Sequence, residues 1–409
     1  MMENPSSNKD FLIKRQNTIA YFQFNPNIIS DLEIDKNLLD FIEHYLNRGS
    51  VSNMKMSKIR AWEKAFLQRF KPDNEYYIIE RGIDYVIDML NMIYEFHSNI
   101  IQQDCPQLIK DNRNKIEDIC SYEGYKKALK IKKLKKLKSY EIAYFDHMFR
   151  YTHKEEILFF INLIYTYDIY IAVAKTAETY QFSYPDLLPS SDLYLDIEGL
   201  FHPFIENPVK NKVTIGESNN MVFVTGPNMA GKSTFLRSIA VSAYLAHLGF
   251  PVPASNMKIS ILSGIYTTIN ISDSLDLGYS HFYSEVSRIK FISEKMKTQK
   301  NMLIIFDELF RGTNVKDAFD GSLAIISALA RLKKSFYIIS THLLEVAESL
   351  KEKNIQYIYL ETQIRDGHPF YTYKLKDGVS DERLGMYVIK NEKIIETIEE
   401  AINKQYKEA

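Results

Sequence analysis

The chain has 409 residues, of which 45% are apolar and 13% aromatic, and its formal net charge is −1. This length predicts about two to three domains with sizeable cores. The near-zero net charge excludes a molecule that is basic overall, so any contact with nucleic acid has to come from a local patch.

The two cysteines, Cys105 and Cys120, lack metal-binding spacing and fit a reducing compartment. The polar N-terminal stretch contains no apolar core of the kind found in signal sequences. We therefore expect a cytoplasmic protein.

Residues 1–190 are expected to form a helical domain. Apolar residues recur three or four positions apart in the segments 38–46, 62–70, 85–96, 139–149 and 155–180. The stretch 157–174 is long and apolar enough to raise the question of a membrane span, but Asn162, Thr166 and Asp168 interrupt it. A buried helix of a bundle is the better interpretation, and no membrane contact is expected.

A run of lysines stands out within this helical region. Eight of them occur within thirteen residues: Lys126, Lys127, Lys130, Lys132, Lys133, Lys135, Lys136 and Lys138. The apolar residues between them predict a basic amphipathic helix. Two interpretations stay open: salt-dependent contact with nucleic-acid phosphates, or a solvated face that keeps a helical arm soluble. Because the run contains no arginine or aromatic residue, we do not expect it to read bases.

From residue 191 onwards, short apolar runs alternate with helical segments. The runs expected as strands are 193–197, 221–225, 264–270, 303–306, 336–340 and 355–361. This alternation predicts an α/β domain over 191–409, with a mostly parallel sheet covered by helices.

The strand expected at 221–225 leads into the most informative motif of the chain. It consists of Gly226, Pro227, Asn228, Met229, Ala230, Gly231, Lys232, Ser233 and Thr234, and a predicted helix follows over 235–248. The spacing G-x-x-x-x-G-K-[ST] between a strand and a helix predicts a P-loop NTPase. The glycines let backbone N–H groups approach phosphate oxygens, Lys232 reaches the β- and γ-phosphates, and Ser233 ligates Mg²⁺.

A second apolar run, 302–306, ends in two acidic residues, Asp307 and Glu308. Since the carboxyl ends of parallel strands meet at one edge of a sheet, both residues are expected beside the phosphate loop. Asp307 is expected to hold Mg²⁺, and Glu308 to orient or deprotonate an attacking water. The pair favours hydrolysis of the nucleotide over mere binding.

With these motifs, the C-terminal part of the sequence resembles the MutS family. The loop is similar to the family's phosphate loop, with Ala230 where glycine is usual. Further segments agree in order and spacing: His202-Pro203, 246–254, 265–275, 278–285, 307–314, 340–342 and 373–388. The resemblance covers roughly 193–401.

The resemblance implies ATP as the nucleotide and a homodimer whose sites lie across the subunit interface. It implies that Ser280 reaches the γ-phosphate of the opposite subunit, and that His342 lies near the γ-phosphate or the attacking water as a sensor. Asn228 is expected at the phosphates or the Mg²⁺ shell, and Val209 in the segment that packs against adenine. As alternatives, Ser280 caps the helix that follows it, and His342 is a core histidine.

The expected function is a dimeric ATPase whose nucleotide cycle moves helical arms that bind nucleic acid, with DNA the expected class. The family's mismatch-reading domain finds no counterpart in this sequence, and the helical lever region is short, so no direct mismatch reading is expected. The alternative is a nucleotide-gated module whose N-terminal helices bind a protein and no nucleic acid. Neutralising the eight lysines discriminates between these two functions.

Overall fold

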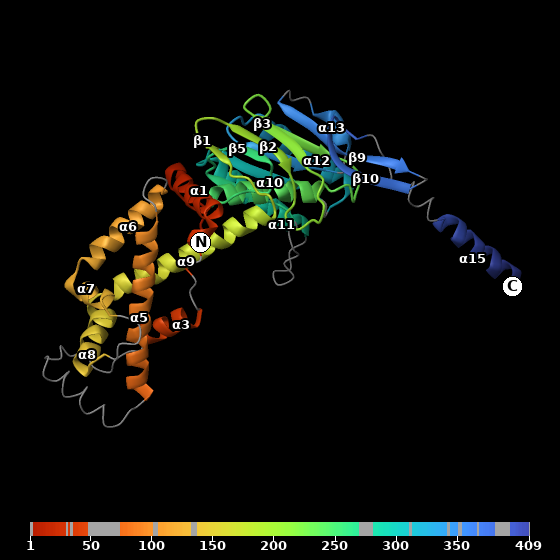
Figure 1. The fold of residues 1–409 in the computed structure, drawn as a ribbon. Coiled ribbons are helices and arrows are strands. Elements are labelled where there is room, and N and C mark those ends of the chain that lie inside the picture. The colour runs from red at the N-terminus through yellow and green to blue at the C-terminus, as the bar shows by residue number, and fades with distance from the viewer. Residues whose placement is uncertain are drawn as a thin grey trace. The chain divides into compact units, whose positions relative to one another are not determined.

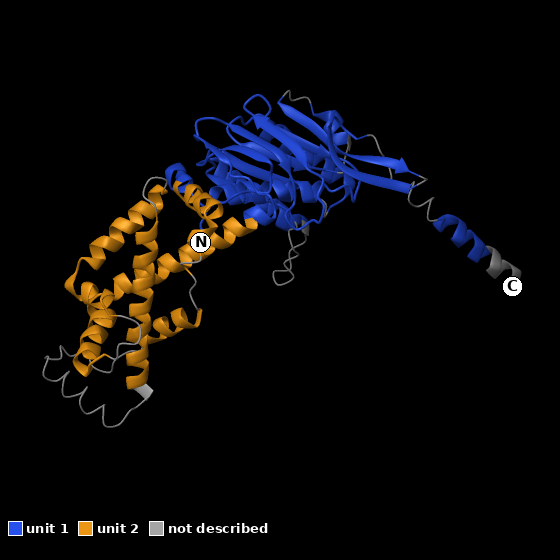
Figure 2. Ribbon diagram, in the orientation of Figure 1, with its two compact units in different colours: residues 1–13, 177–409 blue, residues 14–176 orange. Residues whose placement is uncertain are grey.

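The computed structural model describes residues 3–29, 32, 36–47, 74–100, 105–131, 137–269, 281–310, 313–341, 344–350, 354–365, 368–380 and 393–408. The contacts divide the chain into two compact units, shown in Figure 2. Unit 1 comprises Met1–Ile13 and Ala177–Ala409, and unit 2 comprises Lys14–Thr176.

Unit 2 is helical in its described residues (Figure 1). Its elements are α1 (Lys9–Phe24, which starts in unit 1), α2 (Pro26–Ile29), α3 (Lys36–Asn47), α5 (Asn74–Asn99), α6 (Gln107–Cys120), α7 (Glu123–Leu129), α8 (Ser139–His147), the π-helical turn η2 (Met148–Thr152) and α9 (Lys154–Thr179). The expected helices at 38–46, 85–96, 139–149 and 155–180 correspond to α3, α5, α8 with η2, and α9. The helix expected at 62–70 lies outside the described residues.

Aromatic side chains build the core of unit 2. The ring of Tyr167 on α9 lies 5.4 Å from that of Phe22 and 5.9 Å from that of Phe96, measured between centroids. Among the described helices, α9 is the one long and apolar enough to cross a bilayer, and half of its most apolar stretch is buried inside the protein. Core helices of this kind share the composition of membrane spans, because both surround themselves with apolar groups.

The prediction of one basic helix over 126–138 is wrong in its extent. α7 ends at Leu129, and Leu137 and Lys138 are not helical. A new helix, α8, then starts at Ser139, and its first turn is capped by the Glu141 carboxylate, which accepts from the Lys138 N–H at 2.8 Å. This local cap favours a new helix start at Ser139, so the periodic apolar residues do not belong to one helix over 126–138.

Unit 1 is an α/β unit built on a six-stranded sheet. Its strands are β4 (Met221–Thr225), β6 (Gly264–Thr267), β7 (Met302–Asp307), β8 (Phe336–Ser340), β9 (Ile355–Arg365) and β10 (His368–Asp377). The order is β10-β9-β4-β8-β7-β6, with β9 through β6 parallel and β10 antiparallel to β9. The expected mostly parallel sheet is confirmed.

Helices cover both faces of this sheet, because alternate residues of each strand point to opposite sides. Val222 and Val224 of β4 join a core with α10 (Lys232–His247). Met221 and Phe223 join a second core with α11, α12 and α13. These three helices are α11 (His281–Met296), α12 (Val315–Ala330) and α13 (Leu344–Ser349).

A second sheet of four strands, not anticipated as a separate sheet, adds to the α10 core. Its order is β1 (Asp186–Leu188), β5 (Asn256–Ser260), β2 (Tyr194–Leu200) and β3 (Asn211–Gly216). The expected strand at 193–197 belongs to this sheet rather than to the large one. The last described element of the chain is α15 (Ile394–Glu408).

Unit 1 starts earlier in the chain than the expected boundary at residue 190 and also includes the N-terminus. The Ser6 N–H donates to the His247 carbonyl at 2.8 Å, and Leu12 is completely buried in the same core as α10. The boundary between the two units therefore depends on the packing of segments that are far apart in sequence. The local change of sequence pattern at residue 190 does not reveal such packing.

Candidate functional site

The loop between β4 and α10 has a backbone conformation that depends on its glycines. Gly226 has φ 133° and Gly231 has φ 101°, both in the region that L-residues avoid, and Met229 also has a positive φ of 68°. Ala230, at the position where the MutS family has glycine, does not adopt a positive φ, so a methyl group there causes no backbone strain. α10 then begins at Lys232, and its first N–H groups form a donor set suited to an anion.

Lys232 has a buried side chain that links the loop to β7. Its ammonium donates to the carbonyl oxygens of Gly226 at 2.8 Å and Pro227 at 3.1 Å. The same nitrogen lies 4.0 Å from the Glu308 carboxylate. Burial lowers the pKa of Lys232, while the charges of Glu308 and Asp307 oppose that shift. The carboxyl ends of β4 and β7 thus bring together a cation and two acids, as the sequence predicts.

Two hydroxyls, one at the end of β8 and one directly after β6, contact the residues Asp307 and Glu308. Ser340, at the end of β8, donates to the Asp307 carboxylate at 2.5 Å and accepts from the Glu308 N–H at 3.2 Å. Thr268 accepts from the Asp307 N–H at 3.3 Å. These two residues were not predicted as part of the site. The sheet order that puts β8 beside β7 is the information the sequence lacks.

Glu308 itself has φ 54°, and Phe310 two residues later has φ 61°. A positive φ is unfavourable for residues of this kind, and such conformations concentrate at functional sites. The strained turn directs the chain away from β7 immediately after the two carboxylates.

The residues present suit a magnesium ion held together with phosphate oxygens. Ser233 and Asp307 offer a hydroxyl and a carboxylate, which are the hard oxygen donors that Mg²⁺ prefers, and this ion takes few protein ligands when phosphates supply others. Within the described residues, no group of three or more His, Cys, Asp or Glu side chains is arranged to hold a metal. A two-residue donor set is compatible with that finding.

Tyr373 lies against the loop, and the sequence motifs assigned it no role there. A Cβ built on Gly231 would lie 3.3 Å from the Tyr373 ring, so this ring rests directly against the loop. Asn211 connects it to the segment containing Val209, because its amide donates to the Tyr373 carbonyl at 2.9 Å and to the Val209 carbonyl at 3.4 Å. The signal that could have found it is the Tyr-Lys-Leu segment, 373–375.

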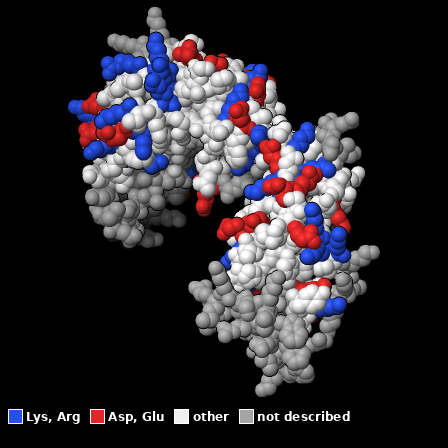
Figure 3. All heavy atoms as spheres, turned by 90° about the vertical axis from the view of Figure 1, so that its left-hand side faces the viewer, with Lys and Arg blue, Asp and Glu red and all other residues white. Residues whose placement is uncertain are grey.

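Several predicted site residues lie outside the described residues: Ser280, His342, Lys132, Lys133, Lys135 and Lys136. The other lysines of the run, Lys126, Lys127, Lys130 and Lys138, are exposed in unit 2. Lys127 forms an exposed ion pair of 3.5 Å with Glu123. On the face drawn in Figure 3, basic and acidic side chains lie interspersed over the described surface.

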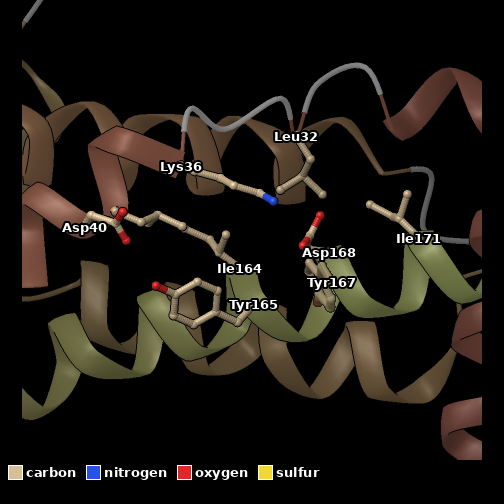
Figure 4. A pocket seen from close by; sticks show the side chains of 9 residues that line it. Leu32, Lys36, Asp40, Ile164, Tyr165, Tyr167, Asp168 and Ile171 are labelled. Atoms are coloured by element: carbon tan, nitrogen blue, oxygen red, sulfur yellow. The ribbon is translucent and has the colours of Figure 1, made fainter. Parts of the chain in front are cut away.

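Unit 2 also contains a cavity of about 320 Å³, which includes none of the residues discussed so far for the loop. Figure 4 shows the side chains of Lys36, Asp40 and Asp168 among those around it. Asp168 is the charged residue that interrupts the apolar sequence of α9, and its position at this cavity explains how the helix accommodates it.

Residues 222–408 match the family model for MutS domain V. The matched stretch begins within β4 and includes the loop, Asp307 and Glu308. This part of the chain is similar to MutS domain V. The DNA mismatch repair protein MutS of Anaplasma phagocytophilum (strain HZ) is 35% identical over 191 residues, which are 46% of this chain and 23% of that protein. The DNA mismatch repair protein MutS of Lysinibacillus sphaericus (strain C3-41) is 31% identical over 228 residues, 54% of this chain and 26% of that protein. The similarity thus covers about a quarter of each of these two relatives.

Proposed function

We propose that this MutS-related protein is an ATPase that couples ATP binding and hydrolysis to nucleic acid held by its helical region, without reading mismatches itself. The observation that supports it most is the meeting of Lys232, Asp307 and Glu308 at the ends of β4 and β7. The match to MutS domain V over the same residues, and the names of the two relatives, favour ATP as nucleotide and DNA as partner.

In this proposal the chain 226–234 is the phosphate loop. Its N–H groups and Lys232 bind the phosphates, and Ser233 and Asp307 hold Mg²⁺, which neutralises phosphate charge when bound. Glu308 accepts a proton from, or orients, the attacking water. Val209 and its neighbours form one wall of the nucleotide site, and Asn228 lies at the phosphates.

The site is completed by a second copy of the chain, a homodimer formed through the ATPase domains. Ser280 of each subunit contacts the γ-phosphate held by the other, and His342 senses the attacking water. These roles follow from the family resemblance. We place the protein in the cytoplasm, since its two relatives are mismatch repair proteins.

ATP turnover with and without duplex DNA, single-stranded DNA, branched DNA and RNA, measured across salt, tests the proposal. Stimulation by one of these substrates, weakened by salt, is the expected result. Glu308→Gln is expected to lower turnover by roughly 10²–10³-fold while ATP remains bound, because proton transfer loses its acceptor. Retained turnover in this variant would contradict the role of Glu308.

A second candidate function is a nucleotide-gated module for protein interaction, and α15 favours it. Ile394, Ile398 and Ile402 are exposed and recur every four residues, together with the exposed Ile395. An exposed apolar stripe of this kind is typical of a helix that binds another protein. Turnover that is indifferent to every nucleic acid in the panel would favour this second function.

A further inference from the structure

Four exposed aromatic side chains follow one another along α8 and η2: Tyr140, Tyr144, His147 and Tyr151. Their spacing of four, three and four residues places them on one side of a helix. The three tyrosines have exposed fractions of 55%, 42% and 49%, and the His147 ring lies 5.7 Å from that of Tyr151. We call these four residues the aromatic face.

Basic side chains lie over this aromatic face. The Lys127 ammonium is 5.9 Å from the centroid of the Tyr144 ring, and the Lys138 ammonium is 6.0 Å from that of Tyr140. Between residues 122 and 151 the sequence has nine basic and three acidic side chains, although the whole chain has a net charge of −1. The structure therefore joins exposed aromatic rings to the most basic segment, a combination that the lysine run alone does not have.

The opposite side of the same helices is firmly packed. Phe145 and Phe149 are buried, with their rings stacked at 5.5 Å. Arg150 and Asp146 form two hydrogen bonds of 2.7 and 2.6 Å, and the Tyr45 hydroxyl of α3 donates to Asp146 at 3.0 Å. The aromatic face is thus presented by a rigid base, which keeps the loss of conformational entropy on binding small.

We propose that the aromatic face binds single-stranded nucleic acid, with bases stacked on Tyr140, Tyr144 and Tyr151 and phosphates contacted by Lys127 and Lys138. The proposal rests on the proposed function, since it specifies the nucleic acid that the helical region would hold. Exposed rings beside cations suit unpaired bases, which offer both a π-face and a phosphate. The bases of a duplex are already stacked on one another, so exposed rings add little to its binding.

Binding of fluorescently labelled oligothymidylate, oligouridylate and a duplex of the same length to the full chain tests this proposal. Tyr144→Leu removes the ring and is expected to weaken single-strand affinity about fivefold or more, while leaving duplex affinity unchanged. Tyr144→Phe is expected to retain wild-type affinity, because stacking needs the ring and not the hydroxyl. Tyr94→Leu, which removes a partly exposed tyrosine from α5, is the matched control and is expected to bind like the wild type.

Unchanged single-strand affinity in both Tyr140→Leu and Tyr144→Leu would overturn the proposal. An equal loss for duplex and single strand in these variants would overturn it too, because the lysines alone would then explain binding. ATP turnover of the same samples separates the two proposals. A protein that hydrolyses ATP but ignores single strands refutes only the aromatic face, whereas tyrosine-dependent binding without turnover refutes only the ATPase. Thermal unfolding of each variant confirms that the helices are intact.

Discussion

The phosphate-loop region of unit 1 and the aromatic face of unit 2 are built in opposite ways. In the loop, the proposed phosphate contacts depend on backbone conformation and on a buried charge: Gly226 and Gly231 have positive φ, and Lys232 is only 5% exposed. On the aromatic face, the proposed binding depends on exposed side chains carried by α8 and η2. A site of the first kind fails when one residue changes, and a surface of the second kind weakens in steps.

The largest effect is expected from Lys232→Met. Removing the buried ammonium leaves phosphate charge uncompensated, so ATP turnover should fall on the order of 10²–10³-fold. A phosphate-release assay measures the loss, and Lys376→Met, at an exposed lysine of β10, serves as the control. Turnover near the wild-type level would show that this loop is not the site, and the contrast between the two regions would disappear.

His97 on α5 makes unit 2 sensitive to acid. Burial lowers its pKa to about 4, with a smaller contribution from the charge of Arg113. His97 takes up a proton near pH 6.5 in the unfolded chain but not in the folded chain. The free energy of unfolding is therefore unaffected by His97 above pH 6.5. It decreases as the pH falls from 6.5 towards 4, by on the order of 1–3 kcal/mol.

Urea unfolding of the wild type and of His97→Leu at pH 7 and pH 5 measures how much of the loss in unfolding free energy is due to His97. The variant is expected to lose less stability than the wild type on acidification. The same pH dependence in both proteins would remove His97 as the cause.

Comparing Gly231→Ala with Gly378→Ala separates two effects of an added Cβ: backbone strain at a positive φ, and a close contact with a neighbouring side chain. Both glycines have similar φ, 101° and 111°, so each alanine should cost about 1–2 kcal/mol in the free energy of unfolding. A Cβ at position 231 also meets the Tyr373 ring at 3.3 Å, whereas one at position 378 meets nothing within 4 Å. Turnover should therefore fall only in Gly231→Ala. An equal loss in both variants would contradict this expectation.

The smallest effect is expected from Lys127→Gln. If Lys127 contacts one phosphate of a single strand, the slope of log affinity against log salt should fall by about 0.7. Stability should hardly change, because the ion pair with Glu123 is exposed. Binding titrations at several salt concentrations, with Lys110→Gln on α6 as the control, measure the slope. An unchanged slope would exclude Lys127 from the contact.

The parts of the fold predicted best from the sequence are the buried parallel strands. β4 and β8 have the predicted bounds, 221–225 and 336–340, because strands covered on both faces are continuous apolar runs. β5 escaped prediction since its sequence, 256–260, alternates exposed polar residues with buried ones over a short length. The packing of Leu12 against α10 also escaped, because no local pattern records a contact so distant in sequence.

For the site, the motif order predicted the meeting of Lys232 with Glu308, since both follow buried strands of one sheet. Tyr373 reaches the loop through the β9–β10 hairpin, and that folding is a tertiary property. The aromatic face was missed for another reason. Its members start two residues after the lysine run ends, and only the end of α7 and the restart at α8 bring Lys127 over Tyr144.

The Ser340 hydroxyl joins the ends of two neighbouring strands of unit 1. It belongs to β8, yet it contacts both the Asp307 carboxylate and the Glu308 backbone at the end of β7. A change in the charge around either acid therefore acts on the last residue of the neighbouring strand. A substitution of Ser340 would therefore disturb the Asp307 carboxylate and the Glu308 backbone together.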